Sequence, residues 1–188
     1  MKTDRDITAG PDLTDPRKAL PWIAGFAAAS YPFFAASGVP EVWEGLVFLA
    51  LLLFPAMEDG ETGYISDGWS LCIGAAGILR MGISGSGPVW GGAAAGFLLA
   101  GLYLWKPESL GEGDVWLGTA IGMWLTAGAS LVFLWLSFVL GGLWGGTCLL
   151  LGWKRRADRI PFGPFLCAGG GAAYLFGERA AVWYGSFF

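Results

Sequence analysis

Long apolar segments joined by short polar connections constrain this chain more than any other feature. Apolar runs occur at about 19–38, 42–57, 69–84, 87–105, 115–129, 131–152 and 164–184. A helix needs ~20 apolar residues to cross a bilayer once, and the apolar stretch 115–153 is far longer. We therefore expect this stretch to fold back on itself, with a turn at residues 127–130.

Helices are the expected form of these runs, because a lipid environment leaves no partner for an unpaired backbone group. With 55% hydrophobic and 14% charged residues, the chain has the composition of a membrane protein. We predict an all-α, polytopic transmembrane bundle of about seven helices, within a range of six to eight. Residues 1–17 are polar and are predicted to form a cytosolic tail, and residues 18–188 a single transmembrane domain.

Small residues recur at a four-residue spacing that lets helices approach one another closely. We expect this spacing to serve packing within the bundle rather than dimerisation, and we make no prediction of the oligomeric state. The pairs are Gly92/Gly96, Gly118/Gly122, Gly141/Gly145 and Gly142/Gly146.

The distribution of basic residues predicts the orientation of the bundle, because Lys and Arg are enriched in cytoplasmic loops. If the N-terminus is cytosolic and the runs alternate, nine of the 11 basic residues face the cytosol. Only Arg80 and Arg179 then lie on the other side. The same assignment puts the loops 58–68, 111–114 and 153–163 on the cytosolic face.

Composition also excludes several classes of function. Net charge is −4 and the basic residues form no patch for nucleic acid. His is absent, and the three Cys residues stand singly in apolar runs without a Cys-x-x-Cys pair. We therefore expect no metal site and no cofactor.

Two aspartates at the ends of apolar runs are the candidates for chemistry. Asp59 follows the run 42–57, and Asp114 precedes the run 115–129 on the same predicted face. Two carboxyls in a low-dielectric site share a proton, and such a pair can activate water without His or metal. The alternative is that each aspartate merely caps a helix at the surface.

Three motifs resemble those of the type IV prepilin peptidase family. Residues 59–67, Asp-Gly-Glu-Thr-Gly-Tyr-Ile-Ser-Asp, resemble the segment in which a catalytic Asp is followed eight residues later by another Asp. Gly111-Glu112-Gly113-Asp114 resembles the family's Gly-x-Gly-Asp motif, with Glu108 at the acidic position before it. Residues 160–166, which include Pro161, Phe162, Gly163 and Pro164, resemble the motif that opens the last helix.

This resemblance implies a membrane-embedded aspartic endopeptidase formed by residues 18–188, with Asp59 and Asp114 as the catalytic pair. Such an enzyme resides in the cytoplasmic (inner) membrane and cuts the basic leader from prepilin-like or pseudopilin-like precursors at the cytosolic face. Its expected partners are the protein substrate and the lipid bilayer, in type IV pilus assembly or protein secretion.

Two departures from the family pattern stand out. Ser66 occupies the position where the family usually has Pro. Larger members also carry a cytosolic insert with paired cysteines and methylate the new N-terminus. Only a few residues join the first two apolar runs here, so we expect cleavage without methylation.

Acidic residues around the motifs are candidates for substrate binding. Glu58, Glu61, Glu108 and Glu112 are suited to receive a basic leader peptide, although a solvated loop face accounts for each of them equally well. Asp67 is expected to cap the helix that follows it, and a contact with substrate is the less favoured interpretation.

Two alternatives accompany this interpretation. A presenilin or signal-peptide-peptidase relative also uses Gly-x-Gly-Asp, but it has Tyr-Asp at the first site, where this chain has Glu58-Asp59. A non-catalytic membrane component, such as a transporter subunit or assembly factor, is the second alternative.

The orientation can be tested by single-cysteine labelling in a variant that lacks the native cysteines. A membrane-impermeant reagent applied from the cytosol should label positions 59, 114 and 155. Positions 41 and 179 should react only from the opposite side. Labelling of positions 41 and 155 from the same side would contradict the predicted topology.

Overall fold

The computed structural model describes residues 42–84, 90–106, 110–153 and 160–186. These residues form six α-helices and no strand, which confirms the all-α prediction. The polar tail 1–17, the run 19–38 and the basic residues 154–156 lie outside the described residues. The helices are α2 (Val42–Thr62), α3 (Asp67–Ser84), α4 (Trp90–Trp105), α5 (Glu112–Gly122), α6 (Ala127–Leu150) and α7 (Gly163–Gly185).

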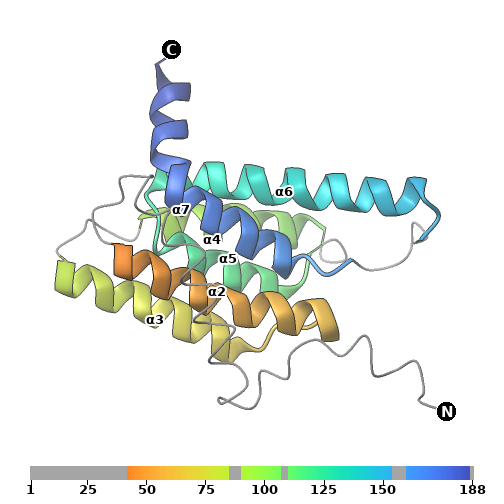
Figure 1. Cartoon of the computed structure of the whole chain (residues 1–188), viewed down its shortest axis with the longest axis horizontal. Helices are drawn as coiled ribbons and strands as arrows, with labels where there is room; N and C mark the ends of the chain where they lie inside the picture. Colours follow the sequence, from red (N-terminus) through yellow and green to blue (C-terminus); the bar gives the residue numbers. More distant parts are fainter. Residues whose placement is uncertain (1–41, 85–89, 107–109, 154–159, 187–188) are drawn as a thin grey trace. The chain divides into compact units, whose positions relative to one another are not determined.

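The chain divides into two units, Met1–Ala50 and Leu51–Phe188. The first unit contributes the beginning of α2 to the described residues. The second unit contains the rest of α2 and α3 to α7, and all three sequence motifs fall within it. Its main helix contacts pair α6 with α7, α4 with α5 and with α6, and α5 with α3 and with α7 (Figure 1).

The short helix α5 is the centre of this second unit. It packs against α3, α4 and α7, and the side chains of Leu117 and Ile121 are completely buried. A helix of 11 residues that is surrounded in this way is stabilised by tertiary packing, because isolated helices of this length are marginal in water.

Glycines allow α4 and α5 to pack with little separation between their backbones. A Cβ atom at Gly92 would lie 2.7 Å from Met123 Cγ, and one at Gly96 would lie 2.6 Å from Thr119 Oγ1. On the facing helix, Gly118 lies against Leu99 and Gly122 against the backbone of Gly91. The predicted pairs Gly92/Gly96 and Gly118/Gly122 thus form one helix contact.

The other two predicted pairs behave differently. Gly141 and Gly145 lie against Phe162 and Ile160, whereas no atom of the described residues approaches within 4 Å of a Cβ placed at Gly142 or Gly146. All four glycines belong to α6. The prediction of close packing therefore holds for the pair Gly141/Gly145 and fails for the pair Gly142/Gly146.

The turn after α5 lies earlier than the sequence predicted. Residues 127–130, where we expected the turn, form the first turn of α6, and the chain reverses at residues 123–126. The Thr126 hydroxyl accepts a hydrogen bond from the Ala129 amide (3.2 Å) and caps α6. The indole of Trp124 donates to the Ile73 carbonyl (2.9 Å), which fastens the turn to α3. The small residues at 127–129 suggested a turn, but the Thr126 cap starts a helix at these residues.

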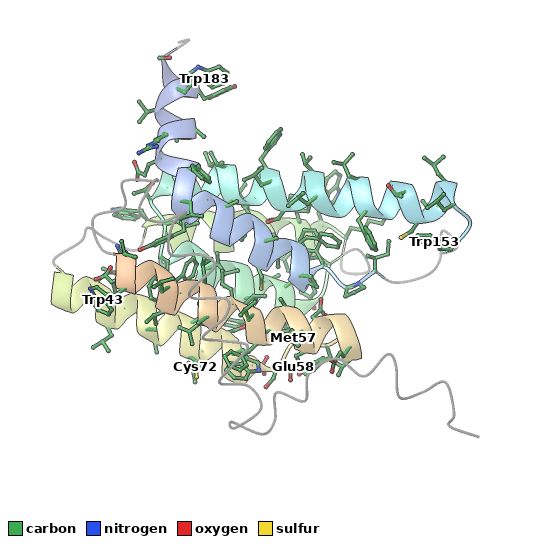
Figure 2. All side chains as sticks on the ribbon, in the orientation of Figure 1. Trp43, Met57, Glu58, Cys72, Trp153 and Trp183 are labelled. Carbon is green, nitrogen blue, oxygen red and sulfur yellow. The ribbon has the colours of Figure 1, made fainter. Side chains whose placement is uncertain are left out.

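One described helix, α6, is long and apolar enough to cross a bilayer, and α4 is comparably apolar but shorter. Both helices expose large apolar side chains, such as Phe97 (81%), Trp105 (85%) and Leu150 (90%). Trp153 and Trp183 are exposed as well (Figure 2). The crossing of a membrane by these helices stays a prediction.

Substitution of Gly91 by Ala should destabilise the protein. A Cβ atom at this position would overlap the carbonyl oxygens of Leu125 and Gly122, and overpacking of this kind costs about 1–3 kcal/mol. Gly101, also on α4, has no described atom within 4 Å of an added methyl group, so Gly101→Ala is the matched control. Thermal unfolding in detergent should show a lower midpoint for Gly91→Ala only. Equal midpoints for the two variants would contradict this close approach of α4 and α5.

Candidate functional site

Asp59 lies in the last turn of α2, where the chain reverses sharply toward α3. Gly63 closes the helix with φ at +68°, a left-handed conformation that glycine adopts without steric strain. Its amide donates a hydrogen bond to the Asp59 carbonyl (2.8 Å), the bond of an αL helix end. This local geometry holds the Asp59 backbone in place immediately before the loop.

The carboxylate of Asp59 is bound by the start of α7, the last helix of the chain. Asp59 Oδ2 accepts a hydrogen bond from the Gly163 amide at 2.7 Å, and the residue is only 4% exposed. Amides at the N-terminus of a helix lack partners within the helix and favour a negative charge. A Cβ atom at Gly163 would lie 2.8 Å from the same oxygen, so only glycine allows this contact undisturbed.

Asp114 is held at the N-terminus of α5 by a different bond. It is the third residue of the helix, and its carboxylate accepts a hydrogen bond from the Gly111 amide (3.1 Å). The predicted alternative, Asp114 as the N-cap itself, is wrong, because Gly111 occupies the N-cap position. Gly111 has no side chain to complete a capping box, so the bond constrains Asp114 without satisfying the next amides. Asp114 is 9% exposed.

The charge of Asp59 acts on the carboxyl of Asp114. Burial, opposed by the Gly111 hydrogen bond and assisted by the nearby charge of Asp59, raises the pKa of Asp114 to about 6. Burial also raises the pKa of Asp59, opposed by the Gly163 amide and assisted by the charge of Glu58. Both aspartates lie outside the apolar runs 42–57 and 115–129. The structure therefore brings together two buried carboxyls that both resist ionisation.

Ile65 connects all three motifs and was not singled out from the sequence. It is 3% exposed, and Cβ atoms placed at Gly113 and Gly163 would lie 3.3 Å from its Cβ and 3.0 Å from its Cδ1. The loop after Asp59, the Gly-x-Gly-Asp turn and the start of α7 thus pack against one side chain. Its place directly before Ser66, the position where the family usually has Pro, is the signal that could have identified it.

Ser66, which departs from the family pattern, forms a hydrogen bond with Glu58. The Ser66 amide donates a hydrogen bond to Glu58 Oε2 at 2.9 Å. Proline has no amide hydrogen, so this bond depends on the residue that replaces it. Glu58 is therefore engaged in holding the loop between α2 and α3, and it is less suited to the substrate role that we considered for it.

The remaining acidic candidates lie at the periphery of the site. Glu61 is exposed in the last turn of α2, and Glu112 is exposed as the first residue of α5. Asp67 is also exposed and is the first residue of α3 rather than its cap, so the predicted cap position is wrong by one residue. Glu108 lies outside the described residues.

The motif before α7 positions that helix. The Phe162 carbonyl accepts hydrogen bonds from the amides of Phe165 (3.0 Å) and Leu166 (3.1 Å). The Phe162 ring packs on Phe138 of α6 with a centroid distance of 5.2 Å. Pro161 precedes this cap, and Pro164 occupies the first turn of α7, where the absence of an amide hydrogen does no harm. These contacts aim the Gly163 amide at Asp59.

Cys167 lies beside the two aspartates. It is one helical turn beyond Gly163 on α7 and is 6% exposed, and its thiol is close enough to Asp59 and Asp114 to sense both charges. The sequence placed Cys167 in an apolar run and did not predict this neighbourhood. Within the described part of the chain, no cluster of three or more His, Cys, Asp or Glu side chains could hold a metal ion.

Comparison with known proteins identifies relatives of this chain. A profile of the type IV leader peptidase family matches residues 46–146, which include Asp59 and Asp114. No solved structure matches the chain.

Three relatives are described as prepilin leader peptidase/N-methyltransferase. That of Burkholderia pseudomallei (strain 1026b) is 32% identical over 167 residues, or 80% of this chain and 51% of the relative. The relative from Bacillus subtilis (strain 168) is 30% identical over 160 residues, 80% of this chain and 64% of its own length. The relative from Aeromonas salmonicida (strain A449) is 35% identical over 99 residues, or 50% of this chain and 34% of the relative. The matches thus span less than two thirds of each relative.

The raised pKa of Asp114 predicts how its replacement changes stability with pH. The pKa of this carboxyl is about 6 in the folded protein and about 4 in the unfolded chain. Between these values the unfolded chain loses its proton more easily, so the folding stability falls as pH rises. Relative to Asp114→Asn, the native protein should therefore lose up to about 3 kcal/mol of folding free energy between about pH 4 and about pH 7. Thermal unfolding of both proteins across this range measures the change. A stability difference independent of pH would contradict the raised pKa.

Proposed function

This chain belongs to the type IV leader peptidase family, and we propose that it is a membrane-embedded aspartic endopeptidase with Asp59 and Asp114 as its catalytic pair. The observation that carries the proposal is that two buried carboxyls are each anchored by one backbone amide, and that the charge of Asp59 acts on Asp114. Separate surface caps would be exposed and would not sense each other's charge. This arrangement supports chemistry by two carboxyls that share a proton.

The two aspartates are suited to different roles in peptide hydrolysis. Asp59 faces the N-terminus of α7 through the Gly163 amide, which favours its ionised form, and it takes a proton from the attacking water. Asp114, whose pKa is raised to about 6, donates its proton to the carbonyl oxygen of the scissile bond. The tetrahedral intermediate then collapses as Asp59 passes the proton to the leaving amine and Asp114 recovers its own from the intermediate. No cofactor enters this sequence of steps.

The proposed substrates are prepilin-like or pseudopilin-like precursors. Support comes from the description of the relatives as prepilin leader peptidases and from the exposed carboxylates of Glu61 and Glu112 near the site. A basic leader would approach these carboxylates from the cytosol, and an apolar segment would enter from the membrane. The proposed location is the cytoplasmic (inner) membrane, with the site at its cytosolic face.

Replacement of either aspartate by Asn should abolish cleavage. Loss of one member of a catalytic unit lowers the rate on the order of 10⁴-fold or more. The assay is cleavage of a prepilin-type precursor by detergent-solubilised protein, followed by mass spectrometry. Glu178→Gln is the matched control, because Glu178 is an exposed carboxylate on α7 away from the site. Near-native turnover in Asp59→Asn or Asp114→Asn, with a folded protein, would remove that residue from the proposed pair.

Gly163→Ala tests whether the start of α7 positions Asp59. The added methyl group would lie 2.8 Å from Asp59 Oδ2 and displace the carboxylate, so kcat should fall about tenfold or more, equivalent to ~1.4 kcal/mol of transition-state stabilisation. Gly60→Ala is the control, since its methyl group would lie at an ordinary 4.0 Å from Pro164 Cγ. Equal kcat values for the two variants would show that the contact is irrelevant to catalysis.

A further inference from the structure

Glu58 is a half-buried carboxylate directly before Asp59 in α2, and the proposed reaction does not use it (Figure 2). Its Oε2 atom accepts a hydrogen bond from the Ser66 amide at 2.9 Å. Ser66 is the last residue before α3 begins, so this bond crosses the whole turn between the two helices. A carboxylate acceptor makes a stronger bond with an amide than a neutral acceptor does. Glu58 therefore ties the end of the turn to the helix that carries Asp59.

The residue next to Ser66 is the side chain that both glycine motifs contact. Ile65 is 3% exposed, and Cβ atoms placed at Gly113 and Gly163 would lie 3.3 Å from its Cβ and 3.0 Å from its Cδ1. Gly113 belongs to the turn that carries the second aspartate, and the Gly163 amide binds the first one. The Ser66 amide shares a rigid peptide plane with Ile65. A bond that fixes this amide therefore limits the movement of Ile65 against both motifs.

The charge of Glu58 acts on the neighbouring aspartate as well. Burial raises the pKa of Asp59, the Gly163 amide opposes this shift, and the charge of Glu58 adds to it. Two other titratable groups sense the charge of Asp59, namely Asp114 of α5 and Cys167 of α7. The nearby acidic residues Glu61 of α2 and Asp67 of α3 are exposed.

We infer that Glu58 is a positioning residue for the proposed catalytic pair, because its bond to the Ser66 amide holds Ile65 against the starts of α5 and α7. Its charge has a second effect, since it disfavours the ionised form of Asp59 that takes a proton from water. Proline has no amide hydrogen, so this bond requires Ser66 and cannot form where the family's usual Pro stands. The inference rests on the proposed peptidase function and assigns Glu58 an indirect role in it.

Two substitutions separate the bond of Glu58 from its charge. Glu58→Gln keeps an oxygen that can accept from the Ser66 amide and loses the charge, whereas Glu58→Ala loses both. Amide hydrogen exchange of a peptide that covers the Ser66 amide, measured by mass spectrometry, should be about tenfold faster in Glu58→Ala than in the native protein. In Glu58→Gln it should stay within about twofold of native. Equal exchange in all three proteins would overturn the inference.

A double-mutant cycle tests whether Glu58 acts through Ser66. In the assay of precursor cleavage, kcat of Glu58→Ala should be about tenfold below that of Glu58→Gln with little change in KM, because a misplaced pair reacts more slowly. In a chain that also carries Ser66→Pro, the bond is absent, so the two Glu58 variants should have the same kcat. A tenfold difference that persists with Ser66→Pro would contradict the inference.

The charge effect can be measured without a substrate. Because the pKa of Asp59 is raised in the folded protein, the stability of the native chain relative to Asp59→Asn falls as pH rises above about 4. This fall should be smaller in chains that carry Glu58→Gln. In chains that carry Glu178→Gln, which removes an exposed carboxylate of α7, it should be unchanged. An equal fall with and without the Glu58 charge would refute the electrostatic part of the role.

These measurements distinguish failure of the inference from failure of the proposed peptidase function. Exchange and thermal unfolding in detergent need no substrate, so the expected changes in a protein that cleaves nothing would refute the peptidase and retain Glu58 as the residue that positions the aspartates. Cleavage by the native protein, with native exchange and native kcat in Glu58→Ala, would retain the peptidase and refute the inference.

Discussion

The hydrogen bond between the Gly163 amide and the Asp59 carboxylate is the contact on which the site depends. It joins residues 104 positions apart in the chain and connects the end of α2 to the beginning of α7. Without this amide, a carboxylate that is 4% exposed would lose a hydrogen-bond donor, which is strongly unfavourable for a buried charge. The Phe162 cap and its aromatic contact with α6 serve the same bond by setting the start of α7.

Burial makes the pair of aspartates different from ordinary surface carboxylates. Each pKa is raised by desolvation, and each is partly restored by one backbone amide. The proposed two-carboxyl mechanism needs a proton within the pair, and the pKa of about 6 for Asp114 favours its retention at mildly acidic pH. The balance depends on α5, whose glycines admit α4 closely and whose apolar side chains fix the N-terminus that carries Asp114.

The lengths of the apolar runs and the spacing of the glycines made much of the fold predictable. The apolar runs from 42 onward correspond to α2, α3, α4, α5, α6 and α7, with boundaries that shift by a few residues. The turn between α5 and α6 was wrong because a local cap by Thr126 outweighs the tendency of Ala-Gly-Ala-Ser to form a turn. Asp67 is the first residue of α3 rather than its cap. The alternative of Asp114 as an N-cap is wrong because Gly111, three residues earlier, holds that position.

By itself, the sequence determined that the chain is helical, that carboxylates stand at the ends of apolar runs, and that three motifs follow one another in the order of one peptidase family. These features are encoded in local spacing. The tertiary structure alone decided which groups meet: Gly163 with Asp59, Ile65 with both glycine motifs, and Cys167 with the two aspartates. Such contacts join residues that are distant along the chain, and their energies arise only after packing excludes water.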